Sequence, residues 1–291
     1  MTRPAIEGRR VWLVGASSGI GAELARELLR RGAHVAISAR DVARLNVVSG
    51  GRMTVVPVDA VDREAVASAY EQVTDALGGV DAVVWCAGFW KQFDAARWDA
   101  DIFAQHIDVN LLGLNNVLAA TLPTMVQRGS GHVVGIASVA GYRGLAGAEA
   151  YGATKAAQIN LLESLRAALK RHDVRVTTVC PGFVRTEMTA SNEFSMPFLI
   201  DPDQAARAIA DGWEQRRTEI VFPWQMAVLM KIARLLPVRL WAALTSRMSN
   251  PAAMTGPRGT DRRNRPGRLE MARRRTPRVR PARRRPGRGT S

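Results

Sequence analysis

The chain has 291 residues, 47% of them apolar, and only two cysteines, so it has enough apolar residues for a sizeable core and too few cysteines for a disulfide framework. Its formal net charge is +15, but fourteen arginines set against Asp261 and Glu270 place +12 of that charge in residues 251–291. The +3 left for residues 1–250 does not indicate a nucleic-acid-binding domain.

Seven short runs rich in apolar and β-branched residues predict strands. Their apolar character is nearly continuous, which is typical of a parallel sheet with helices on both faces. Cys86 and Cys180 each end one run, and we expect both to be reduced core residues. The runs are Val11–Val14, His34–Ser38, Met53–Val58, Ala82–Cys86, His132–Ala137, Val174–Cys180 and Glu219–Phe222.

Helical periodicity alternates with these strands. Apolar residues recur every three or four positions in three segments, which indicates helices with one buried face. Asp201 followed by Pro202 is a good N-cap and first-turn pair for a further helix through about Trp213. The alternation predicts one doubly wound, Rossmann-type α/β domain over residues 1–222. The apolar sets are Ile20, Leu24, Leu28 and Leu29; Val66, Tyr70, Val73 and Leu77; and Ile159, Leu162, Leu165 and Leu169.

A glycine-rich turn joins the first predicted strand to the first predicted helix. Gly15, Gly19 and Gly21 permit positive φ and let the backbone approach a pyrophosphate, whose charge a helix N-terminus favours. An ordinary tight turn is the alternative. The position of the turn between a strand and an amphipathic helix favours a nucleotide site.

The second predicted strand ends at Ser38, Ala39 and Arg40, where an acidic residue would be expected for the free ribose 2′-hydroxyl of NAD. A guanidinium matches phosphate geometry, so Arg40 favours NADP(H) over NAD(H). The alternative is a solvated arginine that opens the next helix. Asp59, just past the third strand, is a candidate acceptor for the adenine amino group; the alternative is a helix N-cap or turn residue.

Tyr151 and Lys155 are one helical turn apart, so both side chains project from the same helix face. A cation held near a phenol lowers its pKa by roughly 1–3 units, which suits a general acid or base. The alternative is a surface helix whose lysine extends into solvent. Tyr142 is a weaker candidate for proton transfer, because no lysine follows it at helical spacing.

The motifs together, in this order, closely resemble the short-chain dehydrogenase/reductase family over about residues 8–222. They are the Gly15–Gly21 turn, Asp59, Ala87-Gly88, Asn110 within Asp-Val-Asn, Ser138, Tyr151-Gly-Ala-Thr-Lys155 and Pro181-Gly182-Phe-Val-Arg-Thr186. The resemblance implies a Rossmann-type sheet of about seven strands, NAD(P) chemistry and a homo-oligomer. We expect no metal.

The resemblance also implies roles for four residues. Tyr151 would exchange a proton with the reacting oxygen, Ser138 would hold that oxygen, and Lys155 would hold the nicotinamide ribose. Asn110 would position a water that links Lys155 to the proton supply. Taken singly, Ser138 could instead be a turn cap and Asn110 a local backbone hydrogen bonder. The expected cofactor site comprises Gly15, Ser17, Ser18, Gly19, Ile20, Gly21, Arg40, Asp59, Ala87, Gly88, Asn110, Tyr151, Lys155, Pro181, Gly182, Val184 and Thr186.

The segment Glu187–Ile200 is expected to form a lid over the substrate. Its apolar set predicts a hydrophobic carbonyl or alcohol substrate, although the same residues could simply pack the lid down. The set is Met188, Phe194, Met196, Phe198, Leu199 and Ile200.

The C-terminal segment from Phe222 to Met248 is apolar but interrupted by charges and by Pro237, so it does not fit a bilayer span. It predicts two amphipathic helices over residues 223–250 that cap the substrate cleft, form a subunit contact or lie on a membrane surface. The Arg/Pro/Gly-rich tail, residues 251–291, is expected to be disordered. It is a basic arm for nucleic acid or lipid, or a tail of little function produced by a shifted reading frame.

The function expected from these features is carbonyl–alcohol interconversion by hydride transfer with NADP(H). Because residues 1–10 lack the apolar stretch of a secretory signal, we expect a cytoplasmic protein, with peripheral membrane contact left open. The alternative function is a non-catalytic nucleotide sensor that docks on nucleic acid or membrane through its basic tail.

Overall fold

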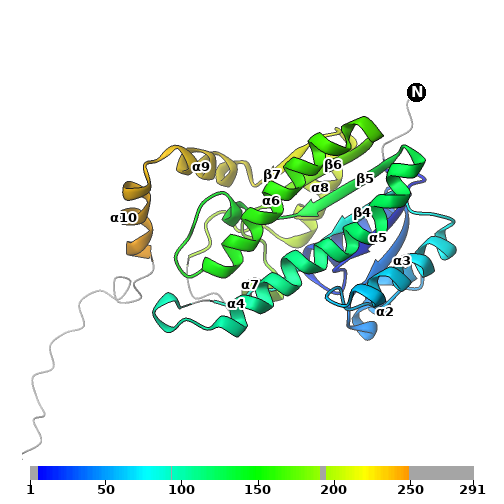
Figure 1. The fold of residues 1–291 in the computed structure, drawn as a ribbon, viewed down its shortest axis with the longest axis horizontal. Helices are drawn as coiled ribbons and strands as arrows, with labels where there is room; N and C mark the ends of the chain where they lie inside the picture. The colour runs from blue at the N-terminus through cyan, green and yellow to red at the C-terminus, as the bar shows by residue number, and fades with distance from the viewer. Residues whose placement is uncertain (1–5, 93, 191–194, 249–291) are drawn as a thin grey trace, which may run out of the picture. The chain divides into compact units, whose positions relative to one another are not determined.

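The computed structural model describes residues 6–92, 94–190 and 195–248 (Figure 1). Within them, a parallel sheet of seven strands has the order β3-β2-β1-β4-β5-β6-β7. This arrangement confirms the predicted doubly wound sheet. The strands are β1 Arg10–Val14, β2 His34–Ser38, β3 Thr54–Val55, β4 Ala82–Trp85, β5 Gly131–Ile136, β6 Val174–Pro181 and β7 Glu219–Phe222.

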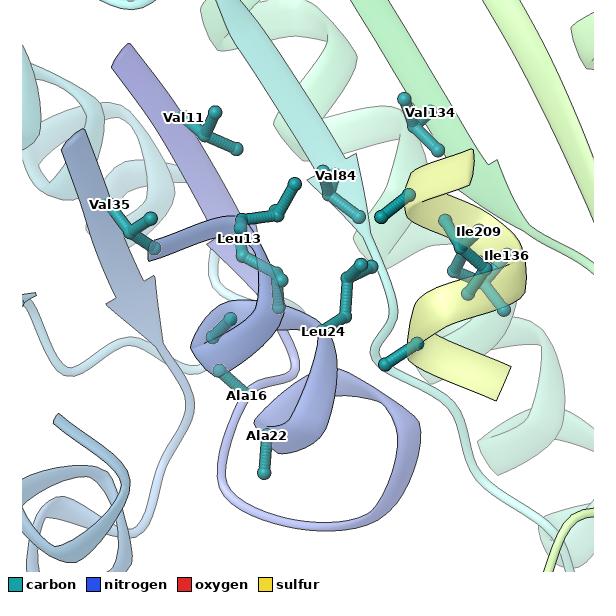
Figure 2. Close-up of a cluster of buried hydrophobic side chains, with 14 of the residues drawn as sticks. Val11, Leu13, Ala16, Ala22, Leu24, Val35, Val84, Val134, Ile136 and Ile209 are labelled. Atoms are coloured by element: carbon teal, nitrogen blue, oxygen red, sulfur yellow. The ribbon is translucent and has the colours of Figure 1, made fainter. Parts of the chain in front are cut away.

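Helices cover both faces of the sheet. One core cluster joins alternate strand residues to α1 (Gly19–Arg30), α2 (Val42–Ser49) and α8 (Pro202–Glu214). Figure 2 shows part of this cluster, with Leu13 and Val84 of the sheet beside Leu24 of α1 and Ile209 of α8. A second cluster packs the opposite strand residues against α3 (Arg63–Leu77), α5 (Gly113–Arg128) and α6 (Glu149–Leu169).

The strand order predicts where a ligand binds along the edge of the sheet. From β1 the chain moves outward to β2 and β3, and it then returns across β1 to β4. In open α/β sheets, ligands bind at the carboxyl ends of the strands where the order reverses, here between β1 and β4. The Gly15 turn follows β1 and Ala87-Gly88 follows β4, so both motifs lie at this point.

The third strand is shorter than the predicted Met53–Val58. It pairs in strand geometry only at Thr54–Val55, although Val56 N and Val58 N still donate to Ile37 O and Ala39 O, both at 3.1 Å. Pro57 lies between these two donors and has no N–H to give, which is compatible with an edge strand only.

The segment between β4 and β5 holds helices that the sequence did not indicate. After the short η1 (Ala95–Arg97), α4 (Ala100–Ile107) continues through a π-turn, η2 (Asp108–Leu112), into α5. Residues 100–128 are long and apolar enough to span a membrane by length and composition alone. The α5 part, however, packs on the sheet through buried Leu114, Val117 and Met125, as a core helix does.

The two predicted C-terminal helices are present. They are α9 (Trp224–Leu235) and α10 (Val238–Met248), and they separate at Pro237. Shorter elements are η3 (Val139–Gly141), η4 (Lys170–His172) and α7 (Glu187–Ala190). The predicted disordered tail, residues 251–291, and Phe194 of the predicted lid lie outside the described residues.

Candidate active site

A cavity of about 460 Å³ lies at the carboxyl ends of the central strands. All the residues expected to contact a cofactor line it except Asn110, and Ser138 lines it as well. Sequence analysis did not single out Asp41, Arg44, Val58, Ala60, Val61, Val109, Ile136, Ala137, Glu187 or Thr189, which also line it.

The glycine turn needs its glycines because the end of β4 lies against it. A Cβ on Gly15, where φ is +96°, would stand 2.2 Å from Ala87 N, and one on Gly21 would stand 2.0 Å from Gly15 O. Ser18 at the N-cap of α1 makes no side-chain capping bond, so its hydroxyl does not satisfy the first-turn N–H groups. Such a helix N-terminus is suited to a phosphate.

Two arginines line the cavity beside the start of α2. Arg40 is exposed, and Arg44, four residues later, pairs through Nη1 with Glu187 of α7 at 2.6 Å. Asp41 caps α2 by accepting from Arg44 N at 3.0 Å. Asp59 also lines the cavity while its Oδ1 accepts from Val61 N at 3.1 Å, so the turn role left open by the sequence is present. A second basic residue close behind Arg40, in the first turn of the next helix, is the signal that could have identified Arg44.

Ser138, Tyr151 and Lys155 converge because η3 lies tightly on α6. A Cβ on Gly141 would stand 2.6 Å from the Lys155 carbonyl carbon, so only glycine permits this approach. Ser138 caps η3, with its Oγ accepting from Ala140 N at 3.1 Å, and it also hydrogen-bonds Tyr151. The cap role and the contact with the phenol therefore coexist.

The electrostatics of Tyr151 differ from the sequence expectation. Burial raises its pKa to about 12, although the hydrogen bond with Ser138 acts in the opposite direction. The Lys155 ammonium lies 5.5 Å from the Tyr151 ring centroid. The predicted lowering by Lys155 is wrong for the protein alone, because desolvation dominates and the ammonium is hydrogen-bonded to other groups.

Lys155 is 3% exposed, and burial lowers its pKa to about 8. Its Nζ donates to Ile136 O at 2.9 Å and to Gln158 Oε1 at 3.0 Å. Gln158 in turn donates from Nε2 to the backbone carbonyl of Asn110. Sequence analysis missed Gln158; the available signal was a polar residue beside Ile159 and three residues after Lys155.

Asn110 lies behind the cavity wall. It is fully buried in η2, where its Nδ2 donates to Phe89 O and to Thr154 Oγ1, each at 3.0 Å, and its Oδ1 accepts from Phe89 N at 2.6 Å. The side chain thus ties the loop after β4 to α6. It is the one expected cofactor residue that does not line the cavity.

The second phenol near the site has a different partner. The Tyr142 hydroxyl donates to Glu219 Oε1 at 2.6 Å, and the Arg234 guanidinium lies over its ring. Burial is the main cause that raises the pKa of Tyr142 far above its ordinary value, and it does not line the cavity.

Apolar side chains lie beside Tyr151 and on the cavity wall. The Trp90 and Tyr151 rings meet edge to face with centroids 5.2 Å apart, and Met188 lines the cavity. Phe198 is 47% exposed and has a φ of +58°, which is unusual for a residue with a Cβ. Both cysteines are free thiols; Cys180 is buried, whereas Cys86 lines the cavity.

Comparisons with known proteins agree with this geometry. A family model described as short chain dehydrogenase matches residues 9–195. An uncharacterized oxidoreductase of Myxococcus xanthus is 39% identical over 246 residues, which cover 82% of this chain and 97% of that protein. One of Mycobacterium tuberculosis is 32% identical over 244 residues, covering 80% and 95%.

Solved structures show the same fold. A short chain dehydrogenase from Burkholderia cenocepacia in complex with NADP superposes with a TM-score of 0.73 at 27% identity, covering 84% of this chain and 99% of that one. A variant of actinorhodin polyketide ketoreductase with NADPH gives a TM-score of 0.67 at 25% identity, covering 74% and 95%.

Proposed function

Because the chain belongs to the short chain dehydrogenase family of NAD(P)-dependent oxidoreductases, we propose that it interconverts a carbonyl and an alcohol on a hydrophobic substrate with NADP(H). The observation that carries this proposal is the convergence of Ser138, Tyr151 and Lys155 at the cavity that the glycine turn also lines. A single cavity thus offers a place for a dinucleotide beside a proton-transfer group.

The residues present fit a dinucleotide. The glycine turn lines the cavity, and its glycines let the chain pass against the Ala87 backbone there, while the uncapped start of α1 offers N–H groups to a pyrophosphate. When bound, the nicotinamide supplies or accepts the hydride. The Lys155 ammonium has three N–H donors, of which Ile136 and Gln158 take two, and the third suits a ribose hydroxyl.

Proton transfer is assigned to Tyr151. During reduction its hydroxyl gives a proton to the carbonyl oxygen, and during oxidation the phenolate takes one from the alcohol. Ser138 hydrogen-bonds the same oxygen and orients it toward the phenol. Asn110 does not line the cavity; its side chain hydrogen-bonds the Phe89 backbone and so fixes the loop that carries Phe89 and Trp90.

The preference for NADP(H) rests on charge. Arg40 and Arg44 both line the ribose end of the cavity, and a 2′-phosphate would be attracted to two guanidinium groups. Position 40 lacks the acidic residue that would be expected for NAD. The carboxylate of the neighbouring Asp41 accepts a hydrogen bond from Arg44 N at the start of α2.

A hydrophobic substrate is supported by Trp90 against the Tyr151 ring and by Met188 on the cavity wall. A homo-oligomer in the cytoplasm is proposed from the family resemblance.

The test monitors NADPH absorbance with a panel of apolar ketones and aldehydes. Wild type should reduce at least one of them, and Tyr151→Phe should lose roughly 10²-fold or more in kcat. Tyr142→Phe is the matched control and should keep kcat within a few-fold, because its hydroxyl faces Glu219. No turnover of any carbonyl, together with nucleotide-dependent binding to nucleic acid, would favour the sensor function instead.

A further inference from the structure

The helices α9 and α10 carry a concentration of exposed apolar side chains, here termed the apolar surface. Of the fifteen large apolar residues exposed in the described part of the chain, eight belong to these two helices. On the opposite side of α9, buried Met226, Met230 and Ala233 face the body of the protein. The apolar surface comprises Trp224, Val228, Leu229, Ile232, Leu235, Val238, Leu240 and Leu244.

The two helices that carry the apolar surface have only basic charged residues, one of which, Lys231, pairs with Glu219 of β7 at 3.3 Å. Residues 223–248 contain no Asp or Glu and four basic residues, namely Lys231, Arg234, Arg239 and Arg247. A second copy docking here by two-fold symmetry would bring the same cationic helices together, which costs electrostatic energy. Anionic headgroups would instead complement them.

We propose that the apolar surface docks this protein on the headgroup region of an anionic bilayer. The basic side chains meet lipid phosphates while the apolar side chains enter the boundary between headgroup and acyl chains. Trp224, which is 71% exposed, is a residue type that favours this interface.

Contacts fix the two helices to the loop that follows Ser138. Arg143 Nη1 donates to Ala233 O and Arg234 O at 2.9 Å, its guanidinium lies over the Trp241 ring, and Trp241 Nε1 donates to Gly144 O at 2.6 Å. A docked α9 and α10 would therefore hold the substrate side of the cavity near the lipid, which suits an apolar substrate.

The experiment is flotation of the full chain with vesicles of phosphatidylcholine alone and of phosphatidylcholine with phosphatidylglycerol. Wild type should float with the anionic vesicles, and the double variant Ile232→Glu, Leu235→Glu should bind at least tenfold more weakly. Val47→Glu is the matched control, since Val47 is 76% exposed on α2, and it should bind as wild type does. Repeating the assay in about 1 M salt, where the Debye length is about 3 Å, should release more of the double variant than of wild type.

Three outcomes would overturn the proposal. In the first, wild type fails to float with anionic vesicles. In the second, the double variant floats as well as wild type does, so that the basic tail would be the binding element. In the third, light scattering shows that the double variant has a smaller oligomer than wild type, so that a second copy covers the surface. Neither readout requires turnover, so failure here is distinct from failure of the proposed reaction.

A second inference comes from an independent observation inside the protein, the hydrogen bonds of Gln158. This side chain is fully buried on α6, accepts from Lys155 Nζ at 3.0 Å and donates to Asn110 O. It therefore occupies the backbone carbonyl of Asn110, the residue expected from the family resemblance to position a water. An amide donates and accepts hydrogen bonds but does not readily relay a proton.

We infer that Gln158 is a positioning residue that holds the Lys155 ammonium and, by occupying the Asn110 carbonyl, closes the route by which a water at Asn110 would link Lys155 to the proton supply. This inference rests on the proposed function. Protons for Tyr151 would then arrive from the cleft itself. Lys155 would keep a fixed geometry because Ile136 O and Gln158 Oε1 hold two of its N–H groups.

The chain offers a direct measurement, because it contains only four lysines, Lys91, Lys155, Lys170 and Lys231. Protein labelled with ¹³C-lysine gives few side-chain signals, and the titration of the Lys155 signal can be followed in the absence of substrate. Gln158→Met removes the acceptor and should lower the Lys155 titration midpoint, whereas Gln158→Glu adds an anion and should raise it. Gln72→Met, on the exposed face of α3, should leave it unchanged.

Activity supplies the second readout. Gln158→Met should lower kcat by tenfold or more with a smaller change in KM, and Gln158→Asn serves if the methionine variant does not fold. An unchanged Lys155 midpoint in folded Gln158 variants would overturn the inference, as would a kcat equal to that of wild type. If the wild-type protein turns over no carbonyl, the proposed reaction is contradicted. The titration of Lys155 still tests the role of Gln158 in that case.

Discussion

Arg44 of α2 and Glu187 of α7 form an ion pair of 2.6 Å, and both residues line the cavity at the carboxyl ends of the central strands. The pair links the part of the cavity proposed to hold the ribose to the segment expected to cover the substrate. Because about half of the Arg44 side chain and two thirds of the Glu187 side chain are exposed, the pair itself contributes little to stability. It can therefore be exchanged for a pairing between Arg44 and a phosphate.

Removal of either arginine should reduce the preference for NADPH. Arg40→Ala and Arg44→Ala should each weaken NADPH binding about five- to tenfold, which corresponds to about 1 kcal/mol for a solvent-screened charge contact, and should leave NADH binding nearly unchanged. Glu187→Gln should tighten NADPH binding by freeing Arg44. Fluorescence titration with both nucleotides measures these effects, with Arg97→Ala as the control. Equal losses for NADH and NADPH would contradict a 2′-phosphate role.

Carbonyl reduction should fall as pH rises through about 8. Burial lowers the pKa of Lys155 to that value, so its ammonium, which is fully present at lower pH, is lost above it. Without the cation, the cavity loses the proposed ribose donor and a positive charge 5.5 Å from the Tyr151 ring centroid. The kcat measured from pH 6 to 10 in wild type should show this limb, and Lys170→Gln should retain it. A rate that stays flat to pH 9.5 would contradict the assignment.

Acid should destabilise the fold through His132. This side chain is buried, its Nε2 pairs with Thr177 Oγ1 at 2.9 Å, its Nδ1 has no hydrogen-bond partner, and burial lowers its pKa from 6.5 to about 3. Between about pH 3 and pH 6.5, His132 therefore binds a proton in the unfolded chain but not in the folded chain. The stabilising contribution is present above pH 6.5 and is lost as pH falls toward 3, by up to about 1.4 kcal/mol per pH unit.

Urea unfolding from pH 7 to 4 measures this effect. His132→Gln should flatten the pH dependence of the unfolding free energy relative to wild type. His34→Gln, at an exposed position, should not. Parallel curves for wild type and His132→Gln would show that other groups cause the acid sensitivity.

Gly15→Ala should abolish nucleotide binding and lower the melting temperature. A Cβ there would overlap Ala87 N, and a φ of +96° is unfavourable for alanine. Gly144→Ala is the matched control, because a Cβ added at Gly144 would have no atom within 4 Å of it. Thermal unfolding with and without NADPH separates the two effects. A Gly15→Ala variant that is still stabilised by NADPH would contradict the placement of the pyrophosphate.

The sequence predicted the sheet well because parallel strands buried on both faces leave continuous apolar runs. It did not reveal α5, since buried Asn116 and Thr121 interrupt its apolar set and the π-turn before it shifts the helical register. Periodicity over a window that contains such a turn is weakened. The edge strand β3 was predicted too long because Pro57 limits pairing that the apolar pattern alone suggests.

The motif residues of the candidate site could be found from local spacing, whereas their environment could not. Gln158 meets Asn110 from 48 positions away, and Arg44 meets Glu187 across 143 positions. Burial of Tyr151 also depends on packing between distant segments, which is why its pKa is raised where spacing alone predicted a lowered one.

Arg143 connects the far end of α9 to the loop that begins at Ser138. If a bilayer displaces α9, the free energy of lipid contact and that of substrate contact become linked through contacts that include this guanidinium. Linkage is reciprocal, so a membrane that tightens substrate binding by some factor must itself be bound more tightly, by the same factor, when substrate is present. Occupancy of the cleft would then regulate how long the enzyme resides on lipid.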